Sequence, residues 1–211
     1  FGRAVSIDGD IAIIGAYDRH SGGSADSGAA YIYQWDGSVW QERAILDASF
    51  DGGSAIGAND EYGFDVDISG TTVVVGNRLD DDGATSRGSV FVYDSADGGT
   101  TWTFTQFIQP AAGGDDQFGV SVDLIDGTLI VGSEFEDTLT GDSGAAWILQ
   151  RAGAAGTTFA EVQRIKASDA AVAGAPRQLV MRQSNTSFLQ RILRSWARRS
   201  RPGMKSLALL Q

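Results

Sequence analysis

Residues 11–16 read Ile-Ala-Ile-Ile-Gly-Ala, a short hydrophobic run that ends in a glycine and an alanine. The same kind of run returns at residues 72–77, as Thr-Val-Val-Val-Gly-Asn, and at residues 128–133, as Thr-Leu-Ile-Val-Gly-Ser. A valine stands ten residues before each of these glycines, and an aromatic residue followed by glycine stands four residues before the valine. The chain is therefore built from a repeat.

A second motif follows the first in every copy. A serine or arginine, a glycine and a run of small and hydrophobic residues follow each first motif, at residues 27–33, 87–93 and 143–149. The aromatic-glycine pairs set intervals of 61 and 56 residues, and they are Phe1-Gly2, Tyr62-Gly63 and Phe118-Gly119. A repeat of this length is typical of radial arrays of small sheets and not of helical solenoids.

Each repeat contains four segments that we expect to be strands, separated by glycine-rich or aspartate-rich turns. The expected strands are residues 3–8, 11–16, 29–35 and 39–46, then 66–68, 72–76, 89–93 and 102–108, then 120–125, 128–132, 145–149 and 159–165. We therefore predict an all-β fold, a partial β-propeller of three four-stranded antiparallel blades. The blade repeats are residues 1–61, 62–117 and 118–174, followed by a basic C-terminal tail at residues 175–211 that is irregular or helical.

The second strand of each repeat lacks polar alternation. Such a strand is expected to be covered on both faces, as in sheets that stack face to face around an axis. Propellers close with four to eight blades, so three blades leave two open blade faces. We expect the chain to be part of a longer array or to self-associate through these faces.

Charge divides the chain sharply. Residues 1–174 hold all 27 acidic residues and eight of the 16 basic ones, a net charge of −19, whereas the last 37 residues hold eight bases and no acid. An acidic body disfavours nucleic acid and anionic membranes as partners. We expect no membrane span, since no apolar run is long enough, and no thiol chemistry, since the chain has no cysteine.

The basic tail has two interpretations. Its apolar residues Phe188, Leu189, Ile192, Leu193 and Trp196 lie at helical spacing among arginines, which fits an amphipathic helix for a membrane surface or an acidic partner. A fourth aromatic-glycine pair is due at residues 174–179 and does not occur, so a lost reading frame also explains the tail. Because Phe1 falls on a repeat motif, we expect a longer protein whose upstream part carries any targeting segment.

The three motifs resemble the FG-GAP repeats of integrin alpha-chain head domains and of many microbial surface proteins. The resemblance covers residues 1 to about 166, although Gly-Ala-Tyr, Gly-Asn-Arg and Gly-Ser-Glu stand where Gly-Ala-Pro is usual. It implies a seven-bladed propeller, extracellular or cell-surface placement, and recognition of protein or glycan partners on the loop faces. Some repeats of this family bind calcium between the first two strands, but the turns here are too short to supply six to eight oxygens. We therefore predict no such metal site and no cofactor.

Acidic residues gather in the loops after the second strands, at the same point of each repeat. A divalent-ion or partner site and a solvated acidic loop both fit this pattern. The candidate ligand-binding residues are Asp18, Asp80, Asp82, Glu134, Glu136 and Asp137.

Aromatic residues on the third and fourth strands also have two interpretations, sugar stacking or filling the space between blades. They are Trp35, Trp40, Trp102 and Trp147, with Tyr31, Tyr33 and Tyr93. The only histidine, His20, has no second histidine or cysteine with which to share a metal, and the spacing shows no Ser-His-Asp arrangement. We predict a non-catalytic binding or adhesion module, with an accessory domain of an extracellular hydrolase as the alternative.

Overall fold

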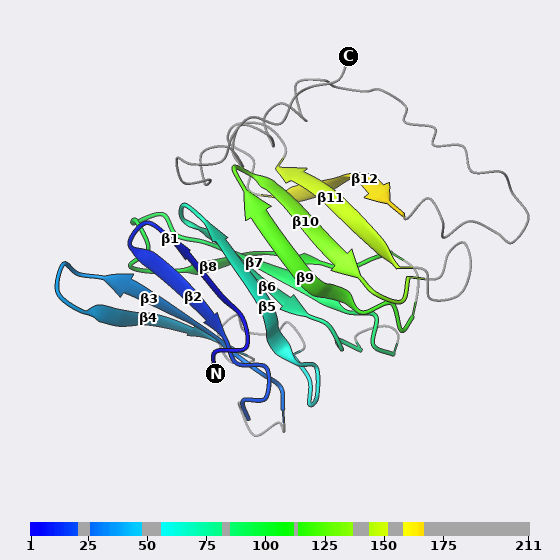
Figure 1. Cartoon of the computed structure of the whole chain (residues 1–211), viewed down its shortest axis with the longest axis horizontal. Coiled ribbons are helices and arrows are strands. Elements are labelled where there is room, and N and C mark those ends of the chain that lie inside the picture. Colours follow the sequence, from blue (N-terminus) through cyan, green and yellow to red (C-terminus); the bar gives the residue numbers. More distant parts are fainter. Residues whose placement is uncertain are drawn as a thin grey trace, which may run out of the picture. The chain divides into compact units, whose positions relative to one another are not determined.

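The computed structural model of the chain describes residues 1–20, 26–47, 56–81, 85–111, 114–136, 144–151 and 158–166. All of them belong to one compact unit, Phe1–Ala175. They form twelve strands in three four-stranded antiparallel sheets, which confirms the predicted fold class (Figure 1). The predicted tail at residues 175–211 lies outside the described residues.

The strands follow one another within each sheet, so every sheet is a meander. Blade 1 contains β1 (Val5–Asp8), β2 (Ile11–Gly15), β3 (Ala30–Trp35) and β4 (Trp40–Leu46). Blade 2 contains β5 (Tyr62–Ser69), β6 (Thr72–Asn77), β7 (Ser89–Asp94) and β8 (Thr103–Ile108). Blade 3 contains β9 (Phe118–Ile125), β10 (Thr128–Ser133), β11 (Ala145–Arg151) and β12 (Phe159–Ile165).

The first hairpin of each blade turns over two residues, as short as the sequence predicts. The flanking pairs are Asp8 with Ile11, Ser69 with Thr72 and Ile125 with Thr128. The first strand of blade 2 begins at Tyr62, four residues before the predicted start. A register shift between Tyr62 and Val66 interrupts the alternation from which that start was predicted.

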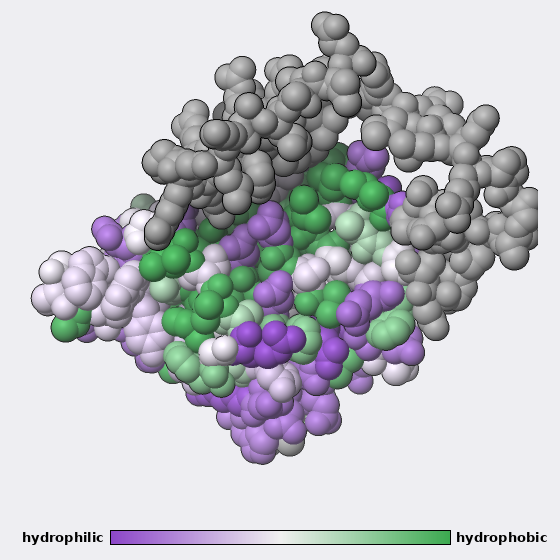
Figure 2. Space-filling view, in the orientation of Figure 1, coloured by the Kyte–Doolittle hydropathy of each residue, from purple (hydrophilic) through white to green (hydrophobic). Residues whose placement is uncertain are grey.

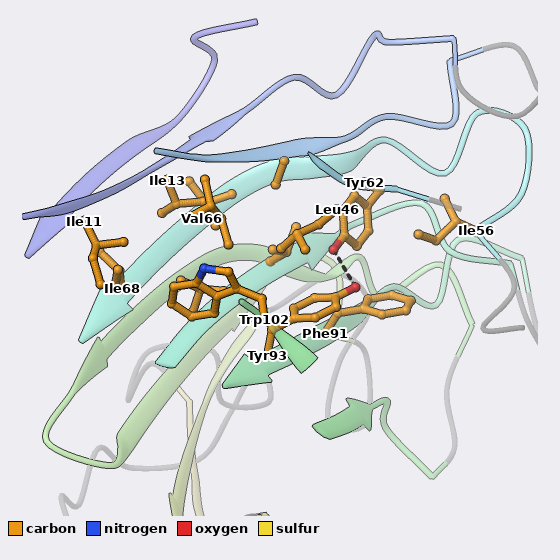
Figure 3. Close-up of a cluster of buried hydrophobic side chains, with 14 residues drawn as sticks. Ile11, Ile13, Leu46, Ile56, Tyr62, Val66, Ile68, Phe91, Tyr93 and Trp102 are labelled. Atoms are coloured by element: carbon orange, nitrogen blue, oxygen red, sulfur yellow. Dashed lines mark hydrogen bonds between the residues drawn. The ribbon is translucent and has the colours of Figure 1, made fainter. Parts of the chain in front are cut away.

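Two hydrophobic cores fill the spaces between neighbouring blades. β6 of the central blade supplies both, because Val73 and Val75 point to the core shared with blade 1 and Val74 points to the core shared with blade 3. Figure 3 shows the first core, in which the hydroxyl of Tyr62 donates a 2.8 Å hydrogen bond to that of Tyr93. The prediction of a second strand covered on both faces is thus confirmed for β6. In β2 and β10 burial alternates, because blades 1 and 3 each have a single neighbour among the described residues.

One carboxylate links the inner strands of all three blades. Oδ1 of Asp67 on β5 accepts a 2.5 Å hydrogen bond from the hydroxyl of Ser6 on β1, and Oδ2 accepts one from the N–H of Leu124 on β9. The neighbouring Asp65 accepts from the N–H of Val122 in the same way, at 2.8 Å. These contacts hold the inner strands β1, β5 and β9 side by side, so residues next to these strands in different blades lie close together.

The repeated glycines are explained by the blade junctions. A Cβ on Gly15 would lie 2.2 Å from the carbonyl oxygen of Gly63, and a Cβ on Gly28 would lie 2.0 Å from that of Tyr62. Gly76 and Gly88 meet Gly119 and Phe118 in the same way at the next junction. In blades 1 and 2 the glycine of the second strand therefore makes room for the main chain of the next aromatic-glycine pair.

Blade 1 presents a hydrophobic face without a neighbour among the described residues. The six residues of this open face of blade 1 are Val5, Ile7, Ala12, Ile14, Tyr31 and Tyr33. Register and repeat spacing make them the equivalents of the blade 2 residues buried against blade 1, namely Val66, Ile68, Val73, Val75, Phe91 and Tyr93. Figure 2 shows hydrophobic surface over β1 and β2. Nothing in the described part of the chain forms a helix with the length and hydropathy needed to cross a membrane.

Candidate functional site

The structure separates the six acidic residues that the sequence singles out. Asp18 and Glu134 are exposed, whereas Asp80 and Glu136 are fully buried. Asp82 and Asp137 lie outside the described residues. The interpretation as solvated acidic loops is therefore wrong for Asp80 and Glu136, whose side chains face the protein interior.

Asp80 and Glu136 occupy the same position of their blades, which in blade 1 is held by Arg19. In each case the main-chain carbonyl accepts a hydrogen bond from a glycine N–H, from Gly28 to Arg19, Gly88 to Asp80 and Gly144 to Glu136. This shared bond closes the loop that follows the second strand. The position is therefore structural, whichever charge it carries.

The side chain at this position forms an ion pair in blades 1 and 3, and it is the basic partner in blade 1 and the acidic partner in blade 3. Arg19 binds Asp47 at 2.7 Å, just after β4, and Glu136 binds Lys166, just after β12, together with Arg164 at 3.1 Å. Each pair joins the loop after the second strand to the end of the outer strand. A buried carboxylate needs such partners, and Glu136 has two of them.

In the central blade the same position contributes to a buried carboxylate pair. The hydroxyl of Ser89 donates a hydrogen bond to Oδ2 of Asp80, and Asp60 lies close enough to feel its charge. Burial raises the pKa of Asp60 to about 6, and the charges of Asp80 and Asp81 add to the rise against the opposing hydrogen bond from the N–H of Gly57. No group of three or more acidic or histidine side chains within the described ranges is placed to hold a metal ion.

A different feature, an open depression of about 430 Å³, lies where all three blades meet. We call it the inner-edge depression. Blade 1 contributes a residue just before β1, blade 2 contributes from β5 and just after β6, and blade 3 contributes the rest. Its lining consists of Arg3, Phe64, Arg78, Val120, Ser121, Gly132, Ser133, Glu134 and Ala145.

The ring of Phe64 organises one wall of this depression. The guanidinium carbons of Arg3 and Arg78 lie 4.3 and 4.1 Å from the ring centroid, and the ring of Tyr17 packs edge-on at 5.6 Å. Nε of Arg78 also donates to Oε2 of Glu61 at 2.5 Å. Cation–π contacts of this kind hold two long side chains in defined positions without neutralising them.

The opposite wall carries a hydroxyl group and a carboxylate. A Cβ on Gly132 would lie 2.2 Å from the hydroxyl oxygen of Ser121, so the glycine makes room for that side chain. Glu134 is exposed at the rim, two residues farther along. The depression thus combines positive, negative, hydroxyl and aromatic groups on strand ends that the blade cores hold in place.

The comparisons with known proteins bear on the repeat itself. The family model of the FG-GAP repeat matches residues 1–33, 40–93 and 102–149, which is more than half of the chain. The chain belongs to the FG-GAP repeat family. This membership, together with the three sheets, indicates a propeller-type binding module.

Two other comparisons add little to the family match. A search of curated proteins found no match. Among solved structures, the chain is similar to the crystal structure of Saccharomyces cerevisiae Sqt1, with a TM-score of 0.49 and 13% sequence identity over 76% of this chain. The chain spans 34% of the length of that structure.

Sequence reasoning found Glu134 but missed the other charged residues of the depression. Arg3 and Phe64 stand directly after the aromatic-glycine pair of their FG-GAP repeats, where the third repeat has Val120. Arg78 and Glu134 stand two residues after the glycine of the second strand, where the first repeat has Tyr17. Both positions vary between repeats whose surroundings are alike, and this variation is the signal that points to them.

The aromatic residues divide between the two interpretations. Tyr93, Trp102 and Trp147 are buried, as the prediction of aromatic packing between FG-GAP blades requires. Trp35 and Trp40 are 37% and 41% exposed and pair across the β3–β4 turn with ring centroids 5.7 Å apart. The exposed pair keeps a surface on which a sugar ring can stack.

Proposed function

We propose that this chain is the recognition part of an extracellular or cell-surface protein and acts as a non-catalytic binding or adhesion module for a protein or glycan partner. The observation that carries the proposal is the inner-edge depression, which gathers side chains from three FG-GAP blades. Residues that lie more than fifty positions apart in the chain meet there on strand ends. A preorganised set of polar groups on a rigid sheet scaffold lowers the entropic cost of binding a partner.

The depression has the mixed chemistry expected of recognition. Arg3 and Glu134 offer a donor and an acceptor of opposite charge, and Val120 and Ala145 add apolar surface to the lining. Ligand sites of this kind rely on a few placed polar groups for orientation and on apolar area for affinity. The acidic surroundings favour solubility and discourage binding to nucleic acid.

An array experiment tests this proposal. The chain is applied to one array of glycans and one of synthetic peptides, and retained ligands are compared between the natural sequence and the double variant Arg3→Ala, Glu134→Ala. The matched control is Arg43→Ala, Glu42→Ala, which removes the same charges from the outer strand β4. We expect specific retention that the first variant loses and the control keeps, whereas equal retention by all three chains would contradict the proposal.

We also propose that the open face of blade 1 binds a second copy of the chain through the far face of its blade 3. The support is that all six positions of the open face carry hydrophobic or aromatic residues, as do the equivalent positions that are buried at both existing junctions. Ile130 on β10 is in turn the equivalent of Ile13 and Val74, which pack against the following blade. Two copies would supply six blades, a number that closes a propeller.

A further inference from the structure

The two basic residues that line the inner-edge depression differ in their ion pairs. The body of the chain has eight basic residues, and five of them, Arg19, Arg78, Arg151, Arg164 and Lys166, make ion pairs with described carboxylates. Arg3 makes no ion pair with any described residue, and its side chain contacts the ring of Phe64. The carboxylate of Asp65 is near enough for the charge of Arg3 to lower its pKa, although burial raises that pKa overall, and the two groups form no ion pair.

Arg3 and Arg78 lie over the same ring, and only one of them has a counter-ion. Their guanidinium carbons are 4.3 and 4.1 Å from the Phe64 centroid, so both positive groups contact the same ring. Glu61 binds Arg78 at 2.5 Å and offsets one charge. A further negative group beside Arg3 would be stabilised by the second positive charge, that of Arg3 itself.

A carboxylate is the anion that fits this arrangement. The guanidinium group is planar and presents its donors as a fork that matches the two oxygens of a carboxylate. Arg3 is exposed, so a ligand can reach its donors. Ser121, on the facing wall, supplies a hydroxyl donor that can complete the binding of the second oxygen.

The remaining groups favour a peptide over a sugar as the carrier of the carboxylate. The ring of Phe64 is already covered by guanidinium groups, which leaves less of its face for a sugar to stack on. Glu134 at the rim can accept a hydrogen bond from a main-chain N–H of a peptide whose acidic side chain binds Arg3. We infer that the inner-edge depression binds an acidic side chain of a protein partner, with Arg3 holding its carboxylate; this inference rests on the proposed function.

Nuclear magnetic resonance of the arginine side chains tests the inference directly. The whole chain is titrated with N-acetyl-aspartate amide, and with N-acetyl-asparagine amide as the uncharged counterpart. We expect a saturable shift of the Arg3 Nε–Hε signal with the aspartate compound only, weakening with added salt because the contact is exposed. Arg3→Gln should weaken the binding at least tenfold, Arg3→Lys less, and the control Arg43→Gln not at all.

The outcomes separate this inference from the proposal beneath it. Equal shifts with the two compounds, or no shift, would overturn the carboxylate site. A shift with glucuronate but not with the aspartate compound would overturn the peptide as carrier. If the arrays still show retention that needs Arg3 and Glu134, the recognition module stands while the acidic-peptide inference falls. Thermal unfolding of each variant shows that lost binding is not lost folding.

Discussion

Blades 1 and 2 carry the same hydrophobic pattern and have different surroundings. Val66 and Ile68 on β5 are 4% and 1% exposed, whereas their equivalents Val5 and Ile7 on β1 are 69% and 62% exposed. These residues pair with the second strand in the same register in both blades, so the difference in their exposure comes from the neighbouring sheet. The pattern written in each repeat therefore describes an interface between blades and not an interior of one blade.

The glycines after the aromatic residues make the same comparison at the level of the main chain. Gly2 and Gly63 have φ angles of +81° and +82°. A Cβ on Gly63 would meet the carbonyl oxygen of Ala29 at 2.3 Å, while a Cβ on Gly2 would have nothing within 4 Å. Both glycines need a positive φ angle, but only Gly63, which follows another blade, lies close to the main chain of a neighbour.

The largest expected effect separates these two glycines. Gly63→Ala should destabilise the chain by more than about 4 kcal/mol or prevent folding, because left-handed strain and a main-chain clash both act. Gly2→Ala should cost about 1–2 kcal/mol from the left-handed conformation alone. Urea unfolding followed by circular dichroism measures both values. Similar losses for the two variants would mean that the junction contact contributes little.

The next effect concerns the aromatic residues of the third strands. Phe91 is fully buried against Tyr62 and Phe107, at ring distances of 5.1 and 5.2 Å, so Phe91→Ala should cost about 3–5 kcal/mol. Its equivalent Tyr31 is half-buried on the open face of blade 1, and Tyr31→Ala should cost about 1 kcal/mol or less. The measurement is again urea unfolding. A loss for Tyr31→Ala as large as that for Phe91→Ala would show that the open face is covered in solution.

A pH experiment compares a buried carboxylate at a junction with an exposed one at a turn. The pKa of Asp60 is raised from 3.8 to about 6, so the folded state holds this proton more tightly than the unfolded state. Stability from this residue is therefore present at low pH and is lost as the pH rises from 3.8 to 6. As the pH rises from 4.5 to 7, the free energy of unfolding of Asp60→Asn should increase relative to that of the natural sequence, by at most about 3 kcal/mol.

Asp36 provides the opposite sign as a control. This exposed carboxylate accepts hydrogen bonds from the N–H groups of Ser38 and Val39, and these hold its pKa well below the usual value. Its contribution is present above pH 3.8 and is lost only at lower pH. The difference in the free energy of unfolding between Asp36→Asn and the natural sequence should therefore not vary with pH between 4.5 and 7. A slope shared by both variants would contradict the assignment to Asp60.

The smallest expected effect on stability is at the open face of blade 1. Ile7→Gln should change the free energy of unfolding by less than about 0.5 kcal/mol, because the side chain is already exposed. Under the proposed self-association it should still lower the fraction of dimer. Sedimentation velocity over a range of concentrations measures that fraction. An unchanged dimer, or a chain that is monomeric from the outset, would contradict association through this face.

The sequence predicted the fold closely because the fold depends on local patterns. Turn residues at fixed offsets and runs of β-branched residues locate eleven of the twelve strands within two residues of their observed bounds. The one larger difference is at β5, which extends beyond its predicted bounds at both ends. In β5 the added residues lie at a register shift, where side-chain alternation carries no information.

The site was harder to predict because burial and proximity are tertiary properties. Glu134 and Glu136 lie two residues apart in one acidic loop, and only the packing of Glu136 against the end of β12 makes it buried while Glu134 is exposed. Arg3, Phe64 and Arg78 come together from two blades, and no spacing rule within a repeat connects them.

The sequence by itself determined that this protein is a series of sheet-forming repeats, because side-chain alternation, turn glycines and hydrophobic runs act over a few residues. Only the tertiary structure decided which repeated positions are covered, which acids are paired and which charged groups line the inner-edge depression. The reason is physical: exposure and electrostatic partners depend on the neighbouring blade, and identical patterns acquire different energies when their neighbours differ.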